Sequence, residues 1–336
     1  MNKSKKILVL ATGGTIASTQ TENGYAPSES IKNILSKITS DRYDITARDI
    51  LFLDSTNIQP EEWCVIAKAV SESRSESFDG IVITHGTDTM AYTSSVLSFM
   101  LKGLPIPVVL TGSQLPLSHP LTDARDNLSL ALAVAASASA GVYLAFDRKV
   151  MLGCRAVKVR TQGFNAFESI NYPYVATVST SGLSYKNEYL PTGLPHLCGD
   201  FKLMDSLDTN VFVVKLTPGI DPKIFDMLLG MHCNGIVIEA FGAGGVQFIN
   251  RDLTGRLAML NDRGVNVVVC SQCLYEISDL SIYEVGRRAL DAGAISALDM
   301  TTEAAYTKLM WAIGNAKDPD GVRRLFETNL CGEIRL

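Results

Sequence analysis

The 336-residue sequence has no run of like charges, and its positive and negative charges nearly cancel. Thirty Lys and Arg residues stand against 35 Asp and Glu residues, which leaves a net charge of -5. A nucleic-acid-binding protein usually carries a basic patch, and a membrane-surface protein a basic run. We therefore expect neither nucleic acid nor a membrane as a partner.

Long apolar runs and a disulfide-like pattern of cysteines are missing too. The first apolar run ends at Ala11, which is too short for a signal peptide, and no stretch approaches the roughly 20 residues of a transmembrane helix. Seven cysteines at irregular spacing do not suggest a disulfide framework. Cys270 and Cys273 form one close pair without the second pair that a zinc site would need. We expect a cytoplasmic protein with no metal or other cofactor.

What the sequence does contain is an alternation of short, β-branched apolar runs with helical patterns. Such runs are typical of strands covered on both faces, so we predict an α/β fold with two open, mostly parallel sheets and helices on both sides. The predicted strands are 7–11, 45–53, 80–84, 107–111, 142–146, 211–216, 235–239 and 265–270, and the predicted helices are 61–73, 89–102, 127–138, 222–231 and 252–263.

One segment interrupts this rhythm. From about Tyr185 to Thr209 the chain contains several prolines and glycines and few periodic apolar residues. Such composition is typical of an interdomain linker. We predict a larger N-terminal catalytic domain at 1–190, a linker at 191–209 and a smaller C-terminal α/β domain at 210–336.

Three predicted strands of the N-terminal domain run directly into glycine and hydroxyl residues. The turns are Thr12–Thr15 (TGGT), His85–Asp88 (HGTD) and Gly112–Gln114 (GSQ). Ligands of open α/β sheets bind at the carboxyl ends of strands, so these turns predict one shared site. Each turn also opens a helix, whose free N–H groups can bind an anion. The alternatives are a nucleotide-phosphate loop, whose glycine spacings are absent, and simple helix capping by Thr87 or Asp88.

Histidine is scarce, which limits the kinds of catalytic site that the sequence can form. Of His85, His119, His196 and His232, only His85 lies near the predicted site, and we interpret it as a turn residue. The nucleophile elbow G-x-S-x-G and the zinc motif H-E-x-x-H are both absent. A serine hydrolase with a histidine base and a zinc hydrolase are therefore not expected.

Threonine remains as the nucleophile, and its hydroxyl needs a neighbouring base. The candidate bases are Tyr25, Asp88 and Lys158, whose amine would be activated if it were desolvated. Lys158 lies in the segment Cys154–Arg160, which has three cations in seven residues. On its own that segment is more typical of a solvated edge strand, and both interpretations stay open.

Two of these motifs carry a family resemblance. Thr12–Ala17 reads TGGTIA, and Val82–Ala91, about 70 residues later, reads VITHGTDTMA. In this order they resemble the two signatures of the bacterial-type L-asparaginases, with the cytoplasmic type I branch as the nearest match. The resemblance extends over essentially the whole chain, including Thr111–Gln114 and Gly163–Phe167.

The resemblance implies an enzyme that hydrolyses the side-chain amide of L-asparagine and assembles as a homodimer or homotetramer. It implies Thr15 as the nucleophile, at the base of a mobile loop, 18–30, that carries Tyr25. Thr87, Asp88 and Lys158 match the second catalytic group. Ser55 matches the residue that holds the substrate α-carboxylate, Asp88 the one that pairs with its α-ammonium, and backbone N–H groups near Thr87 and Ser113 would hold the oxyanion. The residues expected to bind substrate are Ser55, Thr56, Gly86 and Ser113.

The sequence departs from type I relatives around Phe241-Gly242. Relatives carry an arginine shortly before this step and an asparagine shortly after it, where this chain has Glu239 and Gly245. In relatives the asparagine reaches a neighbouring active site, and the region with the cysteine matching Cys273 forms an allosteric asparagine site. Because Glu239 would repel a carboxylate, we do not expect allosteric control by asparagine.

Two competing functions remain for the same pocket. One is a glutaminase-asparaginase or related amidase, because one methylene group changes binding by only about 1–3 kcal/mol. The other is an amino-acid-binding protein that has lost catalysis. The presence of all five expected catalytic residues favours an enzyme over a binding protein.

Overall fold

The computed structural model describes residues 4–21, 24–27, 30–36, 42–190 and 201–335. The chain divides into two compact units, one comprising Met1–Asp205 with Leu330–Gly332 and the other Ser206–Asn329 with Glu333–Leu336. The predicted linker, 191–209, spans the change from one unit to the other, and its first ten residues lie outside the described part of the chain.

The N-terminal unit is built on an eight-stranded sheet in the order β12-β11-β8-β7-β6-β5-β1-β4. The five strands from β7 to β4 are parallel, and β8, β11 and β12 extend the sheet in antiparallel pairs. Their bounds are β1 (Lys5–Gly13), β4 (Tyr43–Leu53), β5 (Gly80–Thr84), β6 (Pro107–Thr111), β7 (Gly141–Phe146), β8 (Lys149–Leu152), β11 (Ala176–Ser179) and β12 (Gly182–Tyr185). The predicted open, mostly parallel sheet is confirmed.

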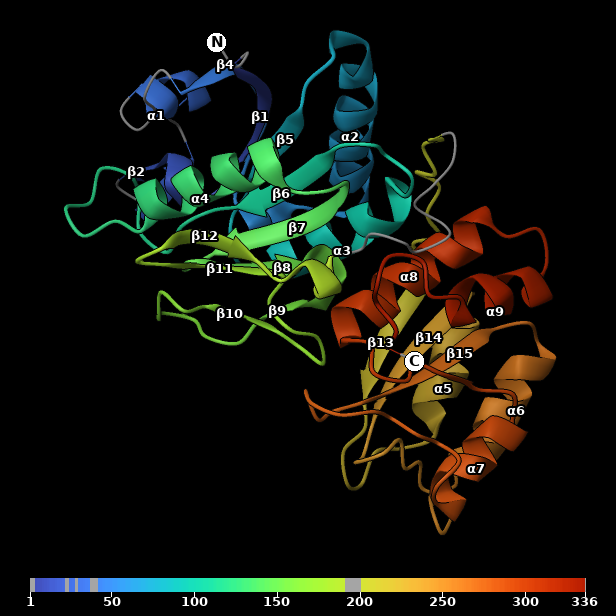
Figure 1. The fold of residues 1–336 in the computed structure, drawn as a ribbon. Helices are drawn as coiled ribbons and strands as arrows, with labels where there is room; N and C mark the ends of the chain where they lie inside the picture. The colour runs from blue at the N-terminus through green and yellow to red at the C-terminus, as the bar shows by residue number, and fades with distance from the viewer. Residues whose placement is uncertain (1–3, 22–23, 28–29, 37–41, 191–200, 336) are drawn as a thin grey trace. The chain divides into compact units, whose positions relative to one another are not determined.

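Helices cover both faces of this sheet. Helix α4 (Ala124–Ser137) lies over one face, and α2 (Pro60–Glu72) and α3 (Met90–Met100) lie on the other (Figure 1). The start of α2 follows from its sequence, because Pro60 suits the first helical position and the Glu62 carboxylate accepts a hydrogen bond from the Gln59 N–H at 2.8 Å. Every residue of β5 and β6 is buried, as expected for strands between two helical layers.

Two short antiparallel ribbons stand beside the large sheet. In one, β2 (Ser18–Thr21) pairs with β3 (Gly24–Pro27). The described part of the predicted loop 18–30 is therefore largely a hairpin. In the other, β9 (Ala156–Lys158) pairs with β10 (Phe167–Ser169).

The C-terminal unit contains a four-stranded parallel sheet in the order β13-β14-β15-β16. On one face Ile236 and Ile238 join an apolar cluster with α5 and α6, and on the other Gly235 lies against Leu309 and Ile313 of α8. The bounds are β13 (Val211–Lys215), β14 (Gly235–Ala240), β15 (Asn266–Ser271), β16 (Ile295–Ser296), α5 (Lys223–Gly230), α6 (Thr254–Asp262), α7 (Glu284–Asp291), α8 (Thr302–Asn315) and α9 (Pro319–Glu327). This unit confirms the second predicted sheet.

The helices are short by the standard of membrane proteins. Across the described ranges, no helix combines the length and the apolar character that a membrane span requires.

Candidate active site

The first two polar turns lie at a switch point of the large sheet. Strands β1 and β5 are neighbours, with β4 beyond β1 and β6 beyond β5. The chain passes from β1 to β4 on one side and from β5 to β6 on the other, so the connections diverge above the β1–β5 boundary. A crevice at the carboxyl ends of the strands is expected there.

A glycine contact brings these two turns together. A Cβ atom on Gly14 would lie 2.4 Å from the Gly86 nitrogen, so the two turns can approach this closely only because position 14 carries no side chain. Gly14 also has φ 76°, a left-handed conformation that suits glycine. Thr15 and Thr87 follow these two glycines directly, so both threonines flank one backbone contact.

The third turn approaches the second in the same way. A Cβ atom on Gly112 would lie 2.2 Å from the His85 carbonyl oxygen. The three polar turns predicted from the sequence therefore meet at one edge of the sheet.

Lys158 joins Thr87 and Asp88 in a compact polar group. Its ammonium donates to the Thr87 hydroxyl oxygen at 2.8 Å and to Asp88 Oδ1 at 2.5 Å. The Lys158 side chain is 15% exposed, while that of Asp88 is 54% exposed. The site therefore combines a shielded cation with a carboxylate that solvent and ligands can reach.

This geometry decides between the two interpretations of the segment around Lys158. Arg155 in the same segment is completely buried, and its Nε donates to the Gly332 carbonyl at 2.7 Å. The solvated-edge-strand interpretation is wrong at Arg155 and Lys158, because the turn Gly153–Arg155 and β9 pack against α3 rather than lying in solvent.

Ser55 lies between the first and second turns. Its hydroxyl oxygen accepts a hydrogen bond from the Asp88 N–H at 3.2 Å, and its carbonyl accepts one from the Thr89 hydroxyl at 2.7 Å. A Cβ atom on Gly86 would lie 2.6 Å from the Ser55 hydroxyl oxygen. Thr56 is turned to Asp54, to which its N–H and hydroxyl both donate.

The turn after β6 is held by its own hydrogen bonds. The Ser113 hydroxyl donates to the Leu115 carbonyl at 2.6 Å and is thus engaged within the turn. The Asp123 carboxylate accepts hydrogen bonds from the N–H groups of Gln114 and Leu115. Asn127 Nδ2 donates to the same carboxylate at 3.0 Å, so the turn is fixed to the start of α4.

Gln114 belongs to the site, although no role was predicted for it from the sequence. Its Oε1 accepts from the Thr87 hydroxyl at 3.2 Å, and its Nε2 donates to the carbonyls of Thr161 and Gly163. The only sequence feature that points to Gln114 is its place in the third polar turn, and a place in a turn does not predict the direction of the side chain.

His85, the first residue of the second turn, is completely buried. Its Nδ1 is 2.7 Å from the Gly86 carbonyl oxygen, which can only accept, so Nδ1 carries the proton. Its Nε2 faces the Thr93 hydroxyl at 2.9 Å. Burial lowers the His85 pKa to about 4, and the imidazole is neutral at pH 7. This agrees with a structural role in the turn.

The structure describes Thr15, the expected nucleophile, but it describes only the backbone of Tyr25, one of the expected bases. Thr15 opens a 3-10 turn, Thr15–Ala17, whose other two residues are buried. In β3, Tyr25 pairs with Gln20 of β2, but its side chain lies outside the described part of the structure.

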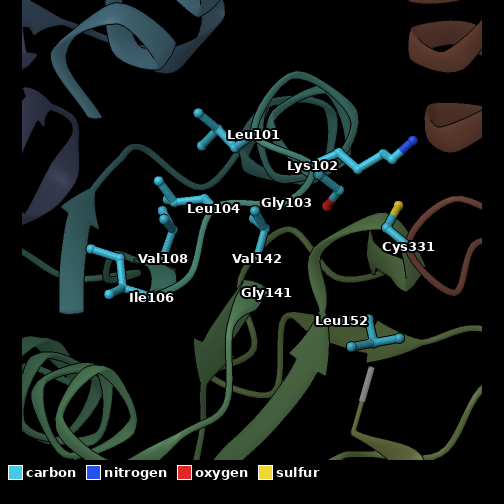
Figure 2. A pocket seen from close by; sticks show the side chains of 11 residues that line it. Leu101, Lys102, Gly103, Leu104, Ile106, Val108, Gly141, Val142, Leu152 and Cys331 are labelled. Carbon is cyan, nitrogen blue, oxygen red and sulfur yellow. The ribbon is translucent and has the colours of Figure 1, made fainter. Parts of the chain in front are cut away.

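A cavity elsewhere in the N-terminal unit does not compete with this site. It lies near the first residues of β6 and β7 and is lined by Leu104, Val108, Val142 and other mostly apolar groups (Figure 2). It encloses only about 20 Å³, enough for one water molecule but not for a substrate.

Comparison with known proteins agrees with the class of enzyme that the fold and the strand-end turns define. Residues 6–190 match the family described as Asparaginase, N-terminal, and residues 210–326 match the Glutaminase/Asparaginase C-terminal domain. The chain therefore belongs to the asparaginase family.

Several relatives match over nearly the whole chain. An L-asparaginase from Thermococcus kodakarensis is 49% identical, covering 98% of this chain and 99% of the relative. L-asparaginase 1 of Escherichia coli K12 is 33% identical over 99% and 98% of the two chains. One subunit of the glutamyl-tRNA(Gln) amidotransferase from T. kodakarensis is 36% identical over 98% of this chain and 76% of the relative. The solved structure of the thermostable L-asparaginase from T. kodakarensis superposes with a TM-score of 0.91 at 48% identity, covering 98% of this chain and 99% of that one.

Proposed function

We propose that this protein is an L-asparaginase that converts L-asparagine and water to L-aspartate and ammonia. The observation that carries the proposal is the group formed by Lys158, Thr87 and Asp88 beside the Gly14–Gly86 contact. The family membership and the full-length similarity to L-asparaginases support the same activity.

The reaction proceeds through an acyl-enzyme. The Thr15 hydroxyl attacks the side-chain carbonyl carbon of asparagine, and Tyr25 or the Thr87–Lys158 pair takes its proton. The carbonyl oxygen becomes an oxyanion, which backbone N–H groups near Thr87 and Ser113 stabilise. Removal of one such donor costs roughly 3 kcal/mol in other hydrolases. Ammonia leaves with the transferred proton, and water then hydrolyses the aspartyl ester to restore Thr15.

The substrate is held by its α-carboxylate and α-ammonium groups. Ser55, Thr56, Gly86 and Ser113 bind the carboxylate end and the reacting amide. The half-exposed Asp88 carboxylate pairs with the ammonium. Because Asp88 also binds Lys158, it links substrate recognition to the base.

The enzyme acts in the cytoplasm as a homodimer or homotetramer, and it needs no metal. Size-exclusion chromatography with light scattering measures the assembly, and activity after dialysis against EDTA tests the metal independence.

The decisive experiment measures ammonia release from asparagine and glutamine by the wild type, Thr15→Ala and Thr87→Ala. Both variants should lose several orders of magnitude in kcat, because Thr15→Ala lacks the nucleophile and Thr87→Ala lacks the hydroxyl that contacts Lys158. Thr180→Ala, at an exposed turn residue between β11 and β12, is the matched control and should retain full activity.

Other outcomes would redirect the proposal. Full activity of Thr15→Ala would move the nucleophile to another residue. Asparagine binding without ammonia release by the wild type would identify a binding protein instead of an enzyme. Equal turnover of glutamine would define a glutaminase-asparaginase.

A further inference from the structure

The carboxamide of Gln114 has only one orientation that satisfies its three neighbours. On one side lie the carbonyl oxygens of Thr161, at 3.2 Å, and Gly163, at 3.1 Å, which can only accept hydrogen bonds. The amide nitrogen must therefore face these carbonyls, and Oε1 must face Thr87. Since Oε1 can only accept, the Thr87 hydroxyl is the donor in their 3.2 Å hydrogen bond.

This assignment fixes where the single hydroxyl proton of Thr87 points. The Thr87 oxygen also accepts a hydrogen bond from the Lys158 ammonium at 2.8 Å. A hydroxyl group has one proton and two acceptor positions, so one acceptor position of Thr87 remains. With its proton held by Gln114, Thr87 presents to a reactant an oxygen that accepts a hydrogen bond.

Gln114 is itself held firmly at both ends. Its backbone N–H donates to both oxygens of the Asp123 carboxylate, at 3.1 and 3.0 Å. Its side chain is tied to the loop that follows Lys158 on β9. The hydroxyl acceptor is thus in place before a substrate arrives, and no side-chain ordering is required during the reaction.

We propose that Gln114 is a positioning residue that holds the Thr87 hydroxyl in its hydrogen-bond-accepting orientation. This inference rests on the proposed function and specifies that Thr87 accepts a hydrogen bond from the reacting group, while the proton of Thr15 passes to Tyr25. Gln114 acts through Thr87, so its loss should reduce kcat far more than it raises KM.

Two variants separate this role from simple tethering of the loop at Thr161 and Gly163. Gln114→Met keeps the approximate shape but loses both the acceptor and the donor. Gln114→Glu keeps an acceptor for Thr87 and loses the donor to the loop. If Gln114 orients Thr87, Gln114→Met should lower kcat about 10- to 100-fold with KM within about twofold, and Gln114→Glu should recover most of that loss.

A tethering role predicts a different pattern. Both variants would then be impaired alike, or Gln114→Glu would be worse because its carboxylate faces two carbonyls, and that pattern overturns the proposal. Gln162→Met makes the same chemical change at an exposed residue of the neighbouring loop and should leave kcat and KM unchanged. Thermal unfolding of each variant identifies any loss of activity that results from unfolding.

Neutron diffraction of the wild type exchanged into D₂O tests the orientation without any assay. Deuterium on Thr87 Oγ1 directed at Gln114 Oε1 supports the proposal, and deuterium directed elsewhere overturns it. A wild type that fails to hydrolyse asparagine would refute the proposed function alone, because the neutron result would still decide the orientation of Thr87.

Discussion

Two lysine–carboxylate pairs of equal length have different surroundings in the two units. Lys158 and Asp88 at the strand ends of the N-terminal unit are 2.5 Å apart, as are Lys308 and Glu333 in the C-terminal unit. Asp88 is 54% exposed, whereas both side chains of the second pair are completely buried. The distance between the two charges is therefore the same in both pairs, and the difference lies in whether solvent and ligands can reach the carboxylate.

The surroundings of the two pairs show the same contrast. Lys158 also donates to Thr87, a hydroxyl with an acceptor position left for a reactant. Lys308 also donates to the Thr328 carbonyl at 2.7 Å and lies over the Phe326 ring. The first pair leaves its carboxylate exposed to a substrate, as the proposed function requires, and the second fixes the C-terminal segment to α8.

The largest effect is expected from Lys158→Met, measured as kcat on asparagine. Turnover should fall by at least 100-fold, because the Thr87 oxygen and the Asp88 carboxylate both lose the ammonium that holds them. The free energy of unfolding should change by less than about 1 kcal/mol, because the carboxylate left behind is exposed. Lys215→Met, at an exposed lysine 3.8 Å from Glu239, is the matched control and should leave kcat within about twofold. A large loss of stability in Lys158→Met would mean that this pair is structural after all.

The opposite result is expected from Lys308→Met, measured by urea denaturation. The variant removes the Lys308 cation from the completely buried Glu333 carboxylate, and breaking a buried pair in this way costs about 3–5 kcal/mol of unfolding free energy. The folded fraction should keep a normal kcat. The double variant Lys308→Met/Glu333→Gln should recover much of the loss, since it removes the charge of Glu333 together with that of Lys308. Equal stability of the single and double variants would contradict this account.

A pH effect of intermediate size is expected from His85 in the N-terminal unit. Desolvation lowers its pKa from 6.5 to about 4, against the opposing effect of the Gly86 carbonyl. The unfolded chain therefore binds the proton first, and stability that is present above pH 6.5 is lost as the pH falls to 4, by roughly 3 kcal/mol. In His85→Gln, the unfolding free energy measured across this range should vary less with pH. An unchanged profile would assign the loss to other groups.

The smallest effect is expected from Glu303 near the strand ends of the C-terminal unit. Its ionisation lowers stability as the pH rises, whereas His85 lowers stability as the pH falls. Burial raises the pKa of its carboxyl above 4.5, and the nearby Glu239 carboxylate raises it further. The folded state binds this proton more tightly, so the stabilisation is present below pH 4.5 and is lost as the pH rises through the folded pKa. Glu303→Gln should raise the melting temperature at pH 7 relative to the wild type, with a smaller gain at pH 4. Equal gains at both pH values would exclude this ionisation as the cause.

The strands with strong apolar patterns could be predicted from the sequence, and the weak ones could not. Strands β5 and β6 have the predicted bounds, because both are continuous β-branched runs buried on all sides. Strands β9 and β10 are three residues long and pair only with each other, so no periodicity can appear in them. Helix α8 went unpredicted although eight of its 14 residues are buried, because these residues form a nearly continuous run from Ala304 to Ala312 instead of recurring every three or four positions.

The candidate site was predictable to the same degree. Thr15, Thr87 and Asp88 follow strands whose carboxyl ends must meet, so their proximity follows from the topology. The contact between Lys158 and Asp88 joins residues 70 positions apart through the β9–β10 ribbon, and only the family resemblance pointed to it. The direction of the Gln114 side chain depends on carbonyls of a loop without regular structure, which no sequence pattern specifies.

The approach of Gly14 to Gly86 also limits how this enzyme can be altered. A side chain at Gly14 would collide with the Gly86 backbone, and one at Gly86 would collide with Ser55, so the close packing of the two threonine turns depends on both glycines. Directed evolution of substrate range would then have to work through the rim of the pocket. Libraries that leave both glycines untouched and vary the surrounding side chains should yield far more folded, active clones.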